Sequence, residues 1–217
     1  MPTLSVNYIS KTYKSPASAC GAGREIPVLS KIVFEVKPRE FVSIIGRNAS
    51  GKSTLLKIIA GVVKATSGTF TVDGNAAYMP QDHTLLPWRT VEDNLLLPGD
   101  IQNISRGAAR ARIQSLLAEF GLDQYVGSYP SLLSGGTRQK IALLRTVIQK
   151  ASILLLDEPF AMIDALTRLE SQTWLQAFVR KNQASALLVT HDMQEAIFLS
   201  DTIYVLDSGN GDIKEKF

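Results

Sequence analysis

The stretch Gly46-Arg47-Asn48-Ala49-Ser50-Gly51-Lys52-Ser53 decides the fold, because it fits the pattern G-x-x-x-x-G-K-[ST] of a phosphate-binding loop. Immediately before it, the apolar run Phe41–Ile45 has the length of a buried strand. After it, apolar residues recur at helical spacing over 55–59 and stop at Gly61. The sequence therefore predicts a strand, a loop and a helix, which is the context in which this pattern binds a nucleoside triphosphate.

The composition of the loop suits a triphosphate. Glycines allow consecutive backbone N–H groups to point inward, and a helix that begins near Lys52 adds its positive N-terminal end. We expect Lys52 to reach the β- and γ-phosphates of ATP and the Ser53 hydroxyl to ligate Mg²⁺. The nucleotide-binding residues predicted in this segment are Gly46, Arg47, Asn48, Ala49, Ser50, Gly51, Lys52, Ser53 and Thr54.

A second pattern, Ile153-Leu154-Leu155-Leu156-Asp157-Glu158-Pro159, places two carboxylates directly after four apolar residues. Pro159 cannot continue an interior strand, so the two acids should lie at the carboxyl end of a strand, where parallel α/β sheets bind their ligands. We expect Asp157 to hold Mg²⁺, mainly through water, and Glu158 to polarise or deprotonate the attacking water.

A third pattern, Leu133-Ser134-Gly135-Gly136-Thr137-Arg138-Gln139-Lys140, precedes an apolar helical stripe. Ser134, Gly135 and Gly136 can present a hydroxyl, backbone N–H groups and a helix N-terminus to an anion. Since the phosphate-binding loop is already complete, we interpret this second surface as one that contacts nucleotide held by another copy of the chain. The alternative is a serine-capped helix after a glycine turn.

The order of strands and helices indicates one α/β domain over 1–217. Strands are expected at Leu4–Ile9, Ile32–Val36, Ile153–Leu156, Ala186–Val189 and Ile203–Leu206, with a turn-rich stretch Lys14–Pro27 and a helix over Asp164–Arg180. Between 84 and 150 the patterns are helical; Thr90 is a candidate cap, and an apolar stripe ends at Gly121. We predict a mostly parallel sheet from 1–83 and 151–217, with an antiparallel opening, and an inserted helical lobe from 84–150.

Composition narrows the class of protein. The chain has 217 residues and a net charge of +3, which does not require a nucleic-acid partner. Cys20 is the only cysteine, which excludes an intramolecular disulfide framework and agrees with a reducing compartment. No apolar run reaches the roughly 18 to 20 residues that cross a bilayer, and the first residues lack the layout of a signal peptide. The expectation is a cytoplasmic protein.

The order of these motifs, with Gln81 and His191 between and after them, resembles the ABC transporter ATPase family across essentially the whole chain. The resemblance implies a P-loop NTPase (RecA-like) core, a small antiparallel β-subdomain and an inserted helical subdomain. It further implies that Tyr13 stacks on adenine, with Tyr8 as the alternative, and that Gln81 senses Mg²⁺ and water. Asp164 would communicate across a dimer, and His191 would contact the γ-phosphate.

The same resemblance implies the partners. ATP and Mg²⁺ would be bound between two copies of the chain, and the dimer would act on transmembrane permease subunits at the inner face of the cell membrane, supplied by a solute-binding protein. The segments 85–88, 91–94 and 159–168 are similar to the nitrate, sulfonate and taurine importer cassettes. Ala49 stands where such cassettes usually carry glycine, which is harmless at negative φ and strained at positive φ.

Two other classes of protein remain as alternatives. A non-transport ABC ATPase would act on DNA or the ribosome, but such proteins carry long heptad segments or two cassettes, and this sequence has neither. A monomeric P-loop kinase would leave Leu133–Lys140 and His191 without a role.

Overall fold

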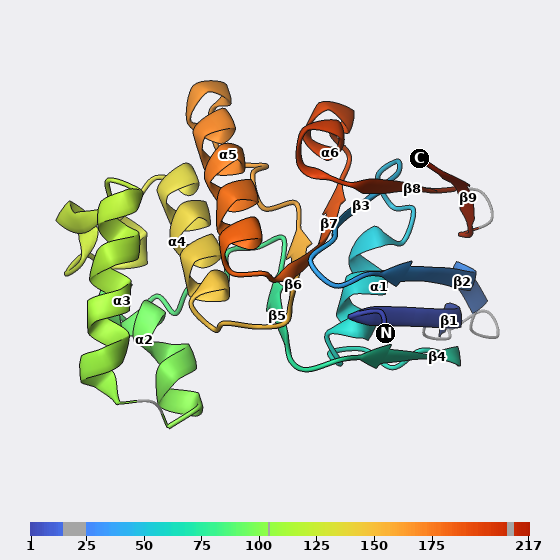
Figure 1. The fold of residues 1–217 in the computed structure, drawn as a ribbon, viewed down its shortest axis with the longest axis horizontal. Helices are drawn as coiled ribbons and strands as arrows, with labels where there is room; N and C mark the ends of the chain where they lie inside the picture. Colours follow the sequence, from blue (N-terminus) through green and yellow to red (C-terminus); the bar gives the residue numbers. More distant parts are fainter. Residues whose placement is uncertain (15–24, 104, 208–210) are drawn as a thin grey trace, which may run out of the picture.

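Two sheets organise the fold of this computed structural model, which describes residues 1–14, 25–103, 105–207 and 211–217. Cys20 lies outside the described residues. A three-stranded antiparallel sheet has the order β2-β1-β4, and a six-stranded sheet has the order β5-β6-β7-β3-β8-β9 (Figure 1). The antiparallel strands are β1 (Leu4–Lys14), β2 (Glu25–Val36) and β4 (Ser67–Val72).

The six-stranded sheet is parallel except at one edge. Its parallel strands are β5 (Ala76–Met79), β6 (Ile153–Asp157), β7 (Ser185–Thr190), β3 (Phe41–Ile45) and β8 (Thr202–Leu206), and β9 (Ile213–Lys216) pairs antiparallel with β8. Helix α1 (Lys52–Ile59) follows β3, α5 (Ala165–Lys181) lies between β6 and β7 in the chain, and α6 (Met193–Leu199) lies between β7 and β8. The mostly parallel α/β sheet predicted from the sequence is confirmed.

The segment 84–150 contains helices and, among its described residues, no strand. Its elements are α2 (Val91–Ile101), α3 (Arg106–Glu119), the 3-10 turns η1 (Asp123–Tyr125) and η2 (Pro130–Leu132), and α4 (Gly135–Val147). Thr90 caps α2 by accepting a hydrogen bond from the Asp93 N–H, and α3 stops before Gly121, whose φ is 62°. In Figure 1 these helices stand beside α5, away from the antiparallel sheet.

Strand β6 separates two apolar cores, because successive side chains of a strand point to opposite faces. Leu154 and Leu156 join a core that also contains the buried faces of α2, α3, α4 and α5. Ile153 and Leu155 join a second core, shared with α1 and the antiparallel sheet. All five residues of β6 are buried, so the strand ending in Asp157 is fixed from both sides.

Some predicted boundaries were wrong. β1 and β2 reach Lys14 and back to Glu25, so strands occupy both ends of the predicted turn-rich stretch. β1 continues past Ile9 through an irregularity at Tyr8, whose φ is 54°. Strands β4, β5 and β9 and helix α6 were not predicted.

Candidate functional site

The phosphate-binding loop joins β3 to α1, and its backbone conformation explains its residues. Gly51 has φ 98° and immediately precedes α1, a conformation that glycine adopts without steric cost. Ala49 has φ 63°, so the question left open by the sequence is answered: this alanine lies in the left-handed region. The loop borders a cavity of about 250 Å³ lined by Val28, Asn48, Ala49, Ser50, Gly51, Lys52, Ser53, Thr54, Gln81 and Glu158.

Lys52 lies inside this loop. Its side chain is buried, and its ammonium donates hydrogen bonds to the carbonyl oxygens of Gly46 and Arg47, each at 2.9 Å. Burial lowers the pKa of Lys52, while the nearby carboxylates of Glu158 and Asp157 act in the opposite direction. A concentrated positive charge is thus held where the predicted phosphates would bind.

Ser53 and Asp157 meet at the start of α1 and the end of β6. The Ser53 hydroxyl donates to Asp157 Oδ1 at 2.9 Å. Asp157 is 1% exposed, and its Oδ2 is buried without a well-formed hydrogen bond among the described residues. The Tyr78 hydroxyl lies near this carboxylate, and burial together with the charge of Asp157 raises the pKa of Tyr78. Burial raises the pKa of Asp157, and the Ser53 hydrogen bond opposes that shift. An unpaired buried carboxylate oxygen beside a hydroxyl fits Mg²⁺, which takes oxygen ligands and retains some of its water.

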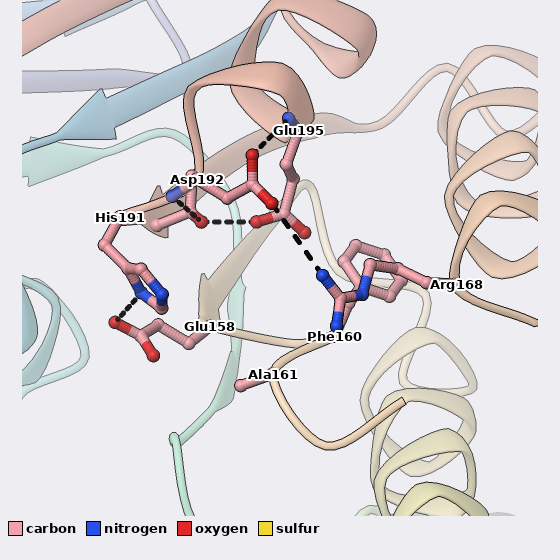
Figure 2. A pocket seen from close by; sticks show the side chains of 8 residues that line it. Glu158, Phe160, Ala161, Arg168, His191, Asp192 and Glu195 are labelled. Atoms are coloured by element: carbon pink, nitrogen blue, oxygen red, sulfur yellow. Dashed lines mark hydrogen bonds and ion pairs between the residues drawn. The ribbon is translucent and has the colours of Figure 1, made fainter. Parts of the chain in front are cut away.

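Glu158 follows directly and carries the other carboxylate of the site. Its backbone has φ 47° and donates from N–H to the Val189 carbonyl of β7 at 2.9 Å. Figure 2 shows its side chain pointing toward His191, whose Nδ1 lies 3.0 Å from Glu158 Oε1. The Gln81 amide donates to the other oxygen at 3.4 Å. The predicted catalytic residues Glu158, His191, Gln81 and Lys52 therefore gather at the carboxyl ends of adjacent strands.

A small cavity of about 70 Å³ is bordered by Glu158 and His191 on one side of the site and by Arg168, Asp192 and Glu195, among others (Figure 2). The Thr190 hydroxyl donates to buried Glu195, and the Asp192 N–H donates to the Thr190 oxygen at 3.0 Å. Asp192 also caps α6 and lies 3.8 Å from the guanidinium of Arg168. Sequence reasoning missed Glu195 and Arg168, although the spacing of an Asp cap and a Glu three residues later was readable as the start of a helix.

The remaining predicted residues lie apart from this cavity. Ser134 caps α4, accepts from the Thr137 N–H at 3.1 Å and is exposed. Asp164 caps α5 in the same manner, and the Thr167 backbone hydrogen bond lowers its pKa. Tyr13 is 39% exposed on β1, with the Lys11 ammonium 4.7 Å from its ring centre. None of Ser134, Asp164 and Tyr13 is among the residues that line the phosphate-binding cavity.

Comparisons with known proteins agree with this geometry. The sequence model described as ABC transporter matches residues 29–161. The chain is 43% identical to the aliphatic sulfonates import ATP-binding protein SsuB of Corynebacterium glutamicum, over 84% of this chain and 75% of the relative. It is 40% identical to the formylaminopyrimidine import ATP-binding protein ThiZ of Halalkalibacterium halodurans, over 82% of this chain and 73% of the relative.

Solved structures give the same result. The dimeric structure of MJ0796, a bacterial ABC transporter cassette, superposes with a TM-score of 0.89 at 26% identity, covering 99% of this chain and 97% of that chain. A second structure of that cassette, in a post-hydrolysis state bound to ADP and Pi, gives a TM-score of 0.88. The predicted P-loop NTPase core with an antiparallel β-subdomain is confirmed. The chain belongs to the ABC transporter family and is an ATP-binding cassette that binds and hydrolyses ATP.

Proposed function

We propose that two copies of this chain hold two ATP molecules at their interface, each between the phosphate-binding loop of one copy and Ser134, Gly135 and Gly136 of the other. The observation that carries this proposal is the separation of the two anion-binding features within one subunit. Ser134 is exposed at the start of α4, whereas the cavity beside the phosphate-binding loop is lined by other residues. The similar solved cassette is described as dimeric.

Within each site, Lys52 binds phosphate oxygens, and Ser53 and Asp157 would hold Mg²⁺. Bound there, Mg²⁺ would neutralise charge on the phosphates. Glu158 accepts the proton of the attacking water, because its carboxylate lies beside the loop and is oriented by His191 and Gln81. His191 is half-exposed and can turn toward a γ-phosphate while staying near Glu158.

The roles of the two outlying residues follow the same dimer. Asp164 stands at the exposed start of α5, where it can face a second subunit. Tyr13 offers an aromatic face for adenine at the exposed end of β1, and Tyr8 offers another at 65% exposure. The division of the chain into a core of 1–83 and 151–217 and a helical subdomain of 84–150 belongs to this proposal.

The base assignment is tested by Glu158→Gln, which keeps the shape of the side chain and removes its basicity. This variant should bind ATP, accumulate as a dimer on size-exclusion chromatography, and hydrolyse ATP at least about a hundredfold more slowly. Glu170→Gln, on the exposed face of α5, is the matched control and should keep wild-type turnover. Wild-type turnover in Glu158→Gln would show that the base assignment is wrong.

The dimer site is tested by Ser134→Arg. A bulky cation at the start of α4 should abolish hydrolysis while ATP binding to the isolated chain stays within about twofold, since its own phosphate-binding loop is intact. Ser131→Arg, three residues earlier and also exposed, is the control. Loss of ATP binding in Ser134→Arg alone would argue against a role in trans.

We further propose that the dimer energises uptake of a small organic anion, of the sulfonate type, through membrane permease subunits at the cytoplasmic face, supplied by a solute-binding protein. Several relatives of this chain are named import ATP-binding proteins, and among them several are named for aliphatic sulfonates. No helix of the described residues is long and apolar enough to cross a membrane. The permease would dock on the segment 81–97, where Trp88 is 71% exposed.

Purification of the chain with its membrane partner, followed by ATPase assays with alkanesulfonates, taurine and nitrate, tests the transported class. Sulfonates should stimulate hydrolysis in the presence of the binding protein. Trp88→Ala should weaken copurification, whereas Leu132→Ala, which removes a similarly exposed apolar side chain elsewhere in the segment 84–150, should not. Equal weakening by both variants would contradict the docking site.

A further inference from the structure

Gln139 has a fully buried polar side chain, and the roles proposed above for ATP hydrolysis do not include it. It lies in the second turn of α4 and is 0% exposed. Its amide nitrogen donates to the backbone carbonyl of Glu158 at 3.3 Å. A carbonyl oxygen can only accept, so the amide nitrogen has to face Glu158. The Gln139 Oε1 is buried without a partner among the described residues.

This amide is costly where it lies. A buried amide that makes only part of its hydrogen bonds loses hydration that it does not recover, and an apolar side chain of the same length would avoid that loss. Among the described residues, the Gln139 side chain makes one hydrogen bond, the bond to the Glu158 carbonyl. The buried amide therefore makes physical sense as a link between α4 and the residue that carries the proposed catalytic carboxylate.

The start of α4 also packs against the segment that follows Glu158. A Cβ added to Gly136 would lie 3.2 Å from the Met162 carbonyl oxygen and 3.7 Å from the Ile163 Cα. The other end of this segment is held by Arg168, whose guanidinium donates to the Ile163 carbonyl at 2.9 Å. Residues 158–163 thus lie against α4 at Gln139 and at Gly136.

Glu158 is sensitive to such a contact. Its backbone lies in the left-handed region, at φ 47°. A residue other than glycine keeps this strained conformation only when the surrounding structure holds it there. The Gln139 hydrogen bond is made to the carbonyl of this same residue. A small shift of α4 therefore changes the backbone from which the Glu158 carboxylate extends.

We propose that Gln139 is a positioning residue that couples the signature of one subunit, Leu133–Lys140, to the catalytic carboxylate of that same subunit. The proposal rests on the proposed roles of Ser134 and Glu158. When Ser134 engages ATP held by the partner, α4 is fixed, and Gln139 fixes the Glu158 backbone. Each subunit thereby hydrolyses its own ATP in response to the ATP of the other site.

The first test is Gln139→Met, which conserves the length and shape of the side chain and removes the donor. We expect kcat of the full-length chain to fall about tenfold, the size of one lost hydrogen bond, with KM for ATP within about twofold. Thr146→Val is the matched control, because it removes a buried hydrogen bond within α4 that ends on the Ala142 carbonyl. Its kcat should stay at the wild-type value, and melting temperatures identify any loss of folding.

The second test separates a cis effect from a trans effect in heterodimers purified through two different tags. One heterodimer carries Gln139→Met and Glu158→Gln in the same subunit, and the other carries them in opposite subunits. Single-turnover hydrolysis of radiolabelled ATP reports the remaining site. The proposal predicts that the same-subunit heterodimer matches a Glu158→Gln/wild-type heterodimer, and that the opposite-subunit heterodimer is about tenfold slower.

A slower same-subunit heterodimer would overturn the proposal, since Gln139 would then act on the partner's site through its own signature. Equal rates in the two heterodimers would also overturn it, since Gln139 would then have no specific effect on the Glu158 of its own subunit. Wild-type kcat in Gln139→Met would do the same. Failure of the underlying roles is visible separately, because a homodimer of Glu158→Gln would retain wild-type turnover in that case.

Discussion

Replacing Ala49 by glycine should raise the free energy of unfolding of this chain. Ala49 has φ 63°, in the left-handed region where an L side chain crowds the following carbonyl oxygen. The side chain is exposed, so its removal forfeits no buried apolar contact. The substitution therefore changes backbone strain and chain entropy with little else.

The magnitude follows from two opposing effects. The left-handed conformation costs an L residue about 1–2 kcal/mol, and glycine avoids this cost. Glycine loses more conformational freedom on folding, which costs about 0.5–1 kcal/mol relative to alanine. The net stabilisation is about 0.5–1 kcal/mol. For a domain of this size that difference raises the melting temperature by about 1–4 °C.

Differential scanning calorimetry or urea denaturation of the nucleotide-free chain measures this difference. Ala111→Gly is the matched control, because Ala111 is exposed inside α3, where glycine should lower stability by about 0.5–1 kcal/mol. Opposite signs at the two positions isolate the backbone effect. A melting temperature for Ala49→Gly at or below that of the wild type, with the control behaving as expected, would refute the strain argument.

Two further changes test the interior. Burial raises the pKa of Glu195 above its ordinary value of 4.5. The neutral acid therefore contributes its full stability below pH 4.5, and this contribution is lost as pH rises through the raised pKa. Glu195→Gln, which still accepts from Thr190, should therefore exceed the wild type in urea denaturation at neutral pH and match it near pH 4; a pH-independent difference would contradict this. Asn94 is 0% exposed and hydrogen-bonds four backbone groups of 86–90, so Asn94→Ala should lower the melting temperature by about 5–15 °C, whereas exposed Asn7→Ala should leave it unchanged. Equal melting of the two Asn variants would count against that role.

The elements that the sequence predicted share a strong local signal. The loop before Lys52 and the strand before Asp157 are marked by short patterns whose chemistry depends on neighbours in the chain. α5 carries its own cap at Asp164, so its beginning was readable without the fold. Local information was sufficient where the structure is locally determined.

The missed strands carry a weaker signal. β9 reads Ile-Lys-Glu-Lys and shows no apolar alternation, and β4 alternates only over Thr69–Val72, where Phe70 and Val72 are half-buried. Both exist because a neighbouring strand, β1 or β8, supplies backbone partners. In β1 the register shifts between Val6 and Ile9, which moves later side chains to the other face and hides the continuation of the strand.

The contacts around the candidate site could not be read from sequence for a similar reason. Gln139 and Glu158 are 19 positions apart, and the fold alone brings the amide to the carbonyl. The sign of φ at Ala49 was likewise open, because the loop pattern accepts alanine in either conformation. Local patterns predicted which groups the site contains, and tertiary packing determined which groups contact one another.

The strand order has a consequence for how the chain is made. β3, which leads into the phosphate-binding loop, is flanked in the sheet by β7 and β8, whose residues begin at Ser185. During synthesis, β3 emerges from the ribosome long before either neighbouring strand does. Such non-local pairing slows folding and leaves apolar surface exposed meanwhile. The nucleotide site is therefore among the last features to form on a nascent chain, and chaperone binding should concentrate on its N-terminal half.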